Sequence, residues 1–348
     1  MIELSFLHNQ AIALEEPIEL ATQTVAGVEH IASVQYSTPN PTQFVVSENS
    51  ATSTEIASEA ATSLEAALAS VQDQMLGAVR NCALESAGLA STVVDAAVFH
   101  LERVGHQVRA RIALGACQAL GVDLQHALTL AAASELLHNA SLVHDDLQDQ
   151  DTERRGQPAV WVKYDANTAI CTGDLLLSCS YGVLAQYPNQ SLVGALLRRM
   201  HARTAQAVLG QNADLSYQDK ELHDLAIYKD IVTAKSGALL SLPLELALIA
   251  ARQETFCAQA CEAAQAFSLG YQIIDDVDDY ASDQLRVSGQ VLNVLQVLGK
   301  VTDIASAQVQ ALQLAREQLE QSITLANALP SGAGALLIQI AQKLLARL

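Results

Sequence analysis

The sequence predicts an all-α fold, and three observations support this prediction. Aromatic residues make up only 4% of the 348 residues, too few for the cross-strand aromatic pairs that stabilise sheets. The chain is rich in Ala, Leu, Gln and Glu, which favour helix. No proline interrupts the chain between Pro41 and Pro158, so long helices can form there. A hydrophobic content of 50% is enough to fill a substantial core.

Residues 1–50 are predicted to form an irregular N-terminal extension. Short apolar pieces alternate there with a turn-prone stretch, 37–41, that contains two prolines. Residues 51–348 are predicted to form one all-helical domain. Thr52 and Glu55 have the spacing of a capping box, which predicts that the first helix of this domain begins beside them.

Three further helices are predicted from a capping residue that precedes an apolar, helix-periodic segment. They are Ser91 before 93–104, Asp123 before 124–149, and Asp165 before 166–185. From Leu124 to Val143 the second of these is apolar on nearly every face. We therefore expect it in the middle of a bundle.

Charge and apolar patterning exclude several classes of partner. The net charge of −19 repels nucleic acid phosphates and anionic lipid surfaces. The longest apolar run, 238–251, contains Ser241, Pro243 and Glu245 and is shorter than the roughly 20 residues of a membrane span. The first Lys or Arg is Arg80, so we expect no secretory or transit presequence.

The cysteines favour a reducing compartment. Six are present, at positions 82, 117, 171, 179, 257 and 261, and none forms a CxxC pair. We expect reduced core thiols and a cytoplasmic protein.

Two aspartate clusters carry the chemistry. The central helix ends in Asp145, Asp146 and Asp149, which share one face. A second DDxxD group follows the apolar stretch 264–274, and it consists of Asp275, Asp276 and Asp279. Carboxylates this close repel one another and call for a cation. Because Mg²⁺ keeps waters or phosphate oxygens in its shell, two such clusters suit a Mg²⁺–diphosphate complex better than a closed all-protein cage.

The motifs resemble those of trans-isoprenyl (polyprenyl) diphosphate synthases. Residues 135–146, followed by Asp149, Asp151 and 154–158, are similar to the first aspartate-rich motif of that family, and 272–279 is similar to the second. Between them, Gly173-Asp174, Gly210-Gln211 with Asp214-Leu215, and Tyr228 with 235–237 occur in the family's order. The resemblance covers roughly residues 75–345.

The resemblance implies an isoprenoid-synthase-type helical bundle around a central cavity, with the two aspartate motifs facing each other. It implies a Mg²⁺-dependent prenyltransferase of isoprenoid biosynthesis, which condenses an allylic diphosphate with isopentenyl diphosphate and elongates it to a polyprenyl diphosphate. A homodimer is expected. Ala140 and Ser141, five and four positions before Asp145, are small, so we expect products of C20 or longer.

The resemblance also implies roles for single residues. Mg²⁺ would be held by the six motif aspartates, which together with Lys235 form the expected catalytic set. The expected substrate-binding set is His106, Arg109, Arg154, Arg155, Lys235 and Gln272. Arg155 matches a position that contacts isopentenyl diphosphate, and Lys235 one that touches the allylic diphosphate.

Two departures from the family pattern bear on the second substrate. His106 stands where the family's glycine-lysine-x-x-arginine segment has lysine, which predicts weaker or pH-dependent binding of isopentenyl diphosphate. After Asp279, the family's basic loop is replaced by residues 280–299, in which Arg286 is the only basic residue.

Three other functions agree less well with the sequence. A terpene-cyclase-like diphosphate lyase needs no isopentenyl diphosphate site, but the low aromatic content opposes it. A non-catalytic subunit of a heteromeric synthase is favoured by the missing basic loop and opposed by the intact aspartate motifs. A di-iron bundle would use Glu135 and His138 but needs a second such pair. We therefore interpret His138 as a packed helix histidine and His144 as a hydrogen-bond partner near the aspartates.

Overall fold

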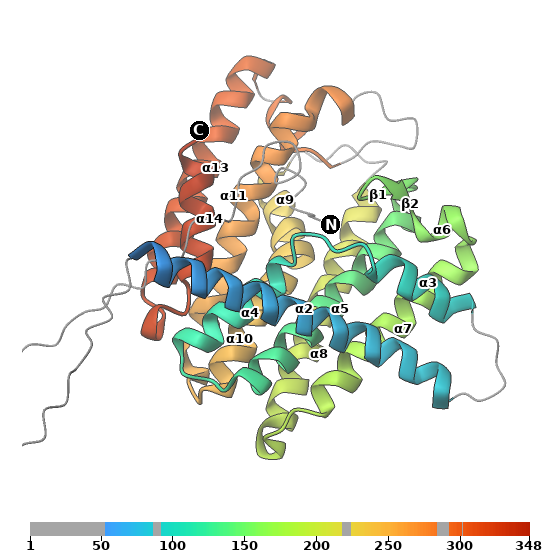
Figure 1. Cartoon of the computed structure of the whole chain (residues 1–348). Coiled ribbons are helices and arrows are strands. Elements are labelled where there is room, and N and C mark those ends of the chain that lie inside the picture. Colours follow the sequence, from blue (N-terminus) through green and yellow to red (C-terminus); the bar gives the residue numbers. More distant parts are fainter. Residues whose placement is uncertain (1–52, 86–91, 218–223, 284–291, 301) are drawn as a thin grey trace, which may run out of the picture. The chain divides into compact units, whose positions relative to one another are not determined.

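Helices dominate the described part of the chain, which comprises residues 53–85, 92–217, 224–283, 292–300 and 302–348 of a computed structural model (Figure 1). The α-helices are α2 (Ser53–Glu85), α3 (Thr92–Leu101), α4 (Val108–Ala119), α5 (Leu124–Gln148), α6 (Val160–Lys163), α7 (Ala166–Ala185), α8 (Gln190–Tyr217), α9 (Leu225–Val232), α10 (Ala238–Ala250), α11 (Cys257–Asp283), α12 (Val294–Leu298), α13 (Ile304–Asn327) and α14 (Ala335–Leu345). A π-helical turn, η1 (Thr233–Gly237), joins α9 to α10, and two short 3₁₀ turns are η2 (Glu254–Phe256) and η3 (Pro330–Gly332). The all-α prediction is confirmed.

The described residues from 67 onward form one compact unit, and residues 53–66, the start of α2, belong to another. The predicted extension 1–50, its boundary and Thr52 lie outside the described residues.

Two of the predicted capping residues begin their helices as expected. Asp123 accepts a hydrogen bond from the Gln125 backbone N–H at 2.9 Å, and Asp165 accepts one from Thr168 at 2.8 Å. The helix predicted over 93–104 is α3, which ends earlier, at Leu101. Its predicted cap, Ser91, lies outside the described residues.

Helix α5 lies at the centre of its neighbours, as predicted. It contacts α4, α7 and α10, and most of its residues from Ala127 to Asp146 are buried. Helix α10 also contacts α11, and α11 in turn packs along α13 (Figure 1). The two helices that end in aspartate motifs, α5 and α11, therefore both contact α10.

The apolar run 238–251 is part of a longer helical segment than the sequence predicts, because α9, η1 and α10 are continuous over 225–250. Within the described residues, this segment and 166–185 are long and apolar enough to cross a membrane by length and composition. In the most apolar 18-residue window of each segment, 83% of the residues are buried in 225–250 and 44% in 166–185. The greater burial is typical of a core helix.

The thiol prediction is confirmed for four cysteines. All six are free, and Cys117, Cys179, Cys257 and Cys261 are buried. Cys171 is exposed and Cys82 is half-buried, so the core assignment is wrong for Cys171.

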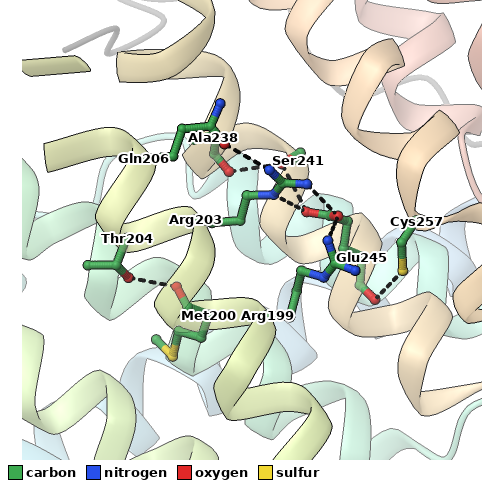
Figure 2. Close-up of polar contacts among 9 residues, drawn as sticks. All are labelled: Arg199, Met200, Arg203, Thr204, Gln206, Ala238, Ser241, Glu245 and Cys257. Atoms are coloured by element: carbon green, nitrogen blue, oxygen red, sulfur yellow. Dashed lines mark hydrogen bonds and ion pairs between the residues drawn. The ribbon is translucent and has the colours of Figure 1, made fainter. Parts of the chain in front are cut away.

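A buried ion-pair cluster joins α8 to α10 (Figure 2). Glu245 is fully buried, and its carboxylate accepts hydrogen bonds from Arg199 at 2.8 Å and from Arg203 at 2.6 and 2.9 Å. The Ser241 hydroxyl donates to the same carboxylate at 3.1 Å. This cluster fixes α8 on α10, next to the η1 turn that carries Lys235.

Candidate active site

The first aspartate motif lies at the buried C-terminal end of α5. Asp145 and Asp146 are 2% and 0% exposed, and Asp149 ends the helix by donating its backbone N–H to the Asp145 carbonyl at 2.8 Å. Asp146 Oδ1 accepts from Arg154 Nε at 2.9 Å and from Arg154 Nη2, whereas Oδ2 is buried without a hydrogen-bond partner. Burial raises the pKa of Asp146 to about 6, although the Arg154 charge opposes this shift.

A short hairpin carries the two arginines that follow the motif and directs them to different partners. Strands β1 (Glu153–Arg154) and β2 (Gln157–Pro158) pair antiparallel, with Arg155 and Gly156 at the turn, both at positive φ. Such a turn matches the twist of a tight hairpin. It lets Arg154 reach Asp146, while Arg155 donates to the Arg103 carbonyl at 2.5 Å.

Arg155 is packed against the segment that carries His106 and Arg109. A Cβ at Gly105 would lie 2.7 Å from the Arg155 guanidinium, so this guanidinium lies directly against the Gly105 backbone. Arg109 is 4% exposed, and its Nη1 lies 3.1 Å from His138 Nε2. His106 is half-buried, and its carbonyl accepts from Arg111 Nε at 3.1 Å. Arg109, in the first turn of α4, and Arg155, beside the segment that precedes this helix, thus both lie near the start of α4.

His138 belongs to this group, which the sequence interpretation missed. A guanidinium only donates, so His138 Nε2 accepts and its proton sits on Nδ1. Burial and then the charges of Arg109 and Arg155 lower the pKa of His138 well below its usual value, so the ring is neutral. A useful signal was its position seven residues before Asp145, two turns back on the same helix.

His144, next to Asp145, is a hydrogen-bond partner as predicted, and its partner is on the neighbouring helix α7. Its Nε2 lies 3.2 Å from the Ile170 carbonyl and 3.5 Å from Asp174, both on α7. Because α7 packs along α5, this side of His144 faces the neighbouring helix.

Lys235 occupies the π turn η1 and pairs with Asp214 of α8, Nζ to Oδ2 at 2.5 Å. Burial disfavours its charge, but Asp214, Asp145 and Asp149 together raise the pKa of Lys235 above its usual value. The ammonium therefore stays charged and faces both α8 and the first motif. A π turn is a common way of aiming a functional side chain.

The second motif is anchored through Asp276. This carboxylate is buried and accepts from Tyr228 Oη, Gln272 Nε2 and the Val294 backbone N–H, each at 2.7 Å. Burial raises the pKa of Asp276 to about 8, against the effect of these donors. Gln272, expected to bind substrate, thus donates to Asp276 in this structure.

The other aspartates of the second motif are more accessible. Asp275 is half-buried and Asp279 is exposed. Asp278, outside the DDxxD spacing, pairs with Arg347 at 3.5 Å. Burial raises the pKa of Tyr228 well above its usual value, and the negative charges of Asp276, Asp275 and Asp214 add to the shift.

The Lys235–Asp214 pair lies near both motifs. The charges of Asp145 and Asp149 help to raise the pKa of Lys235, and the charge of Asp214 helps to raise the pKa of Tyr228, which donates to Asp276 at 2.7 Å. Among the described residues, no three His, Cys, Asp or Glu side chains converge as a ready-made metal site. The ligand atoms present are carboxylate oxygens, and Asp146 Oδ2 is a buried acceptor without a donor. This set fits Mg²⁺ that takes the rest of its ligands from a diphosphate.

The segment after the second motif contains a short, largely apolar helix, α12, among its described residues. Residues 284–291, which include Arg286, lie outside the described residues. Asn293 caps α12 through the Leu295 N–H at 2.9 Å and also donates to the Asp276 carbonyl at 2.7 Å. Val294 and Leu295 are fully buried. Together with the hydrogen bonds to Asp276, this burial holds α12 against α11.

Gly210 allows α8 to approach the π turn, and its replacement should disturb Lys235. An added Cβ would lie 2.4 Å from the Lys235 backbone nitrogen, which cannot move aside as a flexible side chain would. We expect Gly210→Ala to lower the free energy of unfolding by about 1–3 kcal/mol. Urea unfolding measures this change. Gly194→Ala in the same helix is the control, because its Cβ would meet only the Arg198 side chain at 3.4 Å, and it should stabilise by about 0.5–1 kcal/mol. Equal effects of the two substitutions would contradict the packing argument.

Comparison with known proteins gives consistent matches. The family model described as polyprenyl synthetase matches residues 91–328. A geranylgeranyl diphosphate synthase of Cyanophora paradoxa is 32% identical over 207 residues, which are 57% of this chain and 69% of that protein. A geranylgeranyl diphosphate synthase of Methanosarcina mazei is 29% identical over 200 residues, 57% of this chain and 61% of that protein.

Among solved structures, a decaprenyl diphosphate synthase of Rhodobacter capsulatus superposes with a TM-score of 0.69 at 19% identity, covering 82% of this chain and 98% of that one. At this identity the likeness shows the fold: the same all-helical architecture. The expected bundle class is confirmed.

Proposed function

Because the chain belongs to the polyprenyl synthetase family, we propose that it is a Mg²⁺-dependent prenyltransferase that condenses an allylic diphosphate with isopentenyl diphosphate and elongates it to a polyprenyl diphosphate. The observation that carries this proposal is the position of the Lys235–Asp214 pair near both aspartate motifs, with Arg109 and Arg155 both near the start of α4. The aspartate motifs offer ligands for a metal–diphosphate complex. Arg109 and Arg155 offer cations for the diphosphate of the second substrate.

Asp145, Asp146 and Asp149 of the first motif, with Asp275 and Asp279 of the second, would hold the Mg²⁺ ions, and Asp146 would do so through Oδ2, which has no hydrogen-bond donor. Asp276, expected as a sixth ligand, supports them instead, since its two oxygens already accept from Tyr228, Gln272 and Val294. When bound, Mg²⁺ neutralises the diphosphate and makes it a better leaving group. Lys235, kept charged by its aspartate neighbours, contributes a fixed cation toward the same group.

Arg109 and Arg155, with His106 beside them, form the proposed site for isopentenyl diphosphate. Guanidinium groups bind phosphate oxygens in a bidentate manner. Both arginines are already held, Arg109 by His138 and Arg155 by the Arg103 carbonyl. Such prior ordering lowers the entropy cost of orienting the second substrate toward the allylic carbon.

Incubation of the purified protein with Mg²⁺, isopentenyl diphosphate and each of dimethylallyl, geranyl and farnesyl diphosphate tests this function. We expect elongated products of C20 or longer. Consumption of an allylic diphosphate without isopentenyl diphosphate would instead indicate a cyclase-like lyase. Absence of turnover with every primer would favour a non-catalytic subunit.

We place the enzyme in the cytoplasm as a homodimer. Large apolar side chains are exposed on α7 and α8, at Ile170 (48%), Val208 (61%) and Leu209 (69%). Exposed apolar groups of this size are typical of protein interfaces. Light scattering of the purified chain gives its mass in solution.

Product length is expected to depend on Ala140, which is 3% exposed on α5, five positions before Asp145. A growing chain that runs down the bundle from Asp145 must pass this level. Ala140→Phe should therefore shorten the product, as measured by chromatography. Ser141→Ala keeps the neighbouring position small and should leave product length unchanged. If Ala140→Phe still makes full-length product, the residues that limit product length lie deeper in the bundle, near Leu136 or Leu137.

A further inference from the structure

The first turn of α4 has no side-chain cap from its own segment. Its N-cap residue, Gln107, has left-handed backbone angles (φ 49°, ψ 41°), and its side chain makes no capping hydrogen bond. The N–H groups of a first helical turn have no partner within the helix. Those of Arg109 and Ala110 are in this position, in a buried part of the protein.

Glu135 of α5 supplies the missing acceptor. Its Oε2 accepts the Ala110 N–H at 3.0 Å, and the carboxylate also bonds to the Arg109 N–H. A carboxylate at this end of a helix is also favoured by the helix dipole. Glu135 thus caps α4 from a neighbouring helix, at the residue that carries the guanidinium.

The Glu135 carboxylate that caps α4 is buried, so it needs these hydrogen-bond donors. Glu135 is 3% exposed, and burial raises its pKa, while the charges of Arg109 and Arg155 oppose that shift. A buried carboxylate is costly unless it is paired and hydrogen-bonded. Here the two N–H donors and two arginines offset the cost, so the carboxylate and α4 depend on each other.

His138 lies one turn after Glu135 on α5 and binds the guanidinium end of Arg109. Its Nε2 accepts from Arg109 Nη1 at 3.1 Å. Arg109 is therefore fixed at its backbone by Glu135 and at its guanidinium by His138. Both partners belong to the helix that ends in Asp145.

We propose that Glu135 is a positioning residue: by capping α4 it sets the place of Arg109 and so the affinity for isopentenyl diphosphate. The helix that carries the first aspartate motif then also aligns the site of the second substrate. This inference rests on the proposed function.

Two variants test it. Glu135→Leu removes the acceptor, and we expect it to raise the Michaelis constant for isopentenyl diphosphate by about tenfold, as for a lost hydrogen bond to a charged group. The constant for the allylic substrate should stay within about twofold, because the contacts of Lys235 are unchanged. Glu135→Gln keeps an amide oxygen that accepts N–H bonds, so it should restore much of the affinity.

Ser322→Ala is the matched control for lost stability. Its buried hydroxyl joins α13 to α11 through the Ala263 carbonyl at 2.8 Å, so the substitution should lower the melting temperature without a selective effect on either Michaelis constant. Hydrogen exchange gives a readout that needs no turnover: the Arg109 and Ala110 amides should exchange faster in Glu135→Leu than in the wild type.

Parallel rises of both Michaelis constants, or unchanged exchange at these two amides, would overturn the inference. Failure of the proposed function is distinguishable, because the wild-type protein would then consume no isopentenyl diphosphate. Failure of this inference alone leaves wild-type turnover intact.

Discussion

Asp145→Ala is expected to lower turnover by about a thousandfold, since the loss of a metal ligand removes several kcal/mol of stabilisation of the departing diphosphate. The fold should remain intact or become slightly more stable, because Asp145 is buried among other carboxylates and its removal relieves their repulsion. Steady-state rates and melting temperature measure the two effects. Asp275→Ala on the opposite helix should behave in the same way.

Binding of the metal and diphosphate gives a second readout for these variants. Each ligand completes the binding shell of the other, so Mg²⁺ with inorganic diphosphate should raise the wild-type melting temperature more than either alone. Asp145→Ala should lose this joint effect. Asp278→Asn is the control, because Asp278 belongs to the second cluster but forms an exposed pair with Arg347. Wild-type rates in both alanine variants would refute the metal assignment.

The parts of the fold that the sequence predicts well depend on local chemistry. Asp123 and Asp165 bond to backbone N–H groups two and three residues later, so the sequence around them contains the whole interaction. The position of α5 also follows from its own composition, since a helix that is apolar on nearly every face must be surrounded. The two DDxxD spacings are local in the same sense.

The parts that the sequence does not predict depend on distant partners. Asp276 accepts from Val294, eighteen residues later, and from Tyr228 on another helix, and nothing in the DDxxD spacing distinguishes it from Asp275. The hairpin at Arg155 is too short to leave an alternating pattern. Glu135 and His138 have the spacing of a metal-binding pair, and only the packing of α4 on α5 gives them Arg109 as a partner.

Glu245→Leu is expected to cause the largest loss of stability. Glu245 is fully buried and accepts from two arginines, Arg199 and Arg203, on α8 (Figure 2). Removal of one partner from a buried ion pair leaves the other charge without compensation, which costs about 3–5 kcal/mol. The Arg203 side chain is only 14% exposed, so water cannot readily replace the carboxylate. The midpoint of urea unfolding measures the loss.

Arg80→Ala is the control for this experiment, because it removes an ion pair of the opposite kind. Arg80 and Glu102 lie 3.5 Å apart with side chains 55% and 58% exposed, and such pairs contribute about 0–1 kcal/mol. Its unfolding midpoint should therefore remain near that of the wild type. Glu245→Gln keeps an oxygen for Arg203 and should fall between Glu245→Leu and the wild type. If Glu245→Leu unfolds at the same urea concentration as Arg80→Ala, the cluster does not hold α8 on α10, and the burial of its charges must be offset elsewhere.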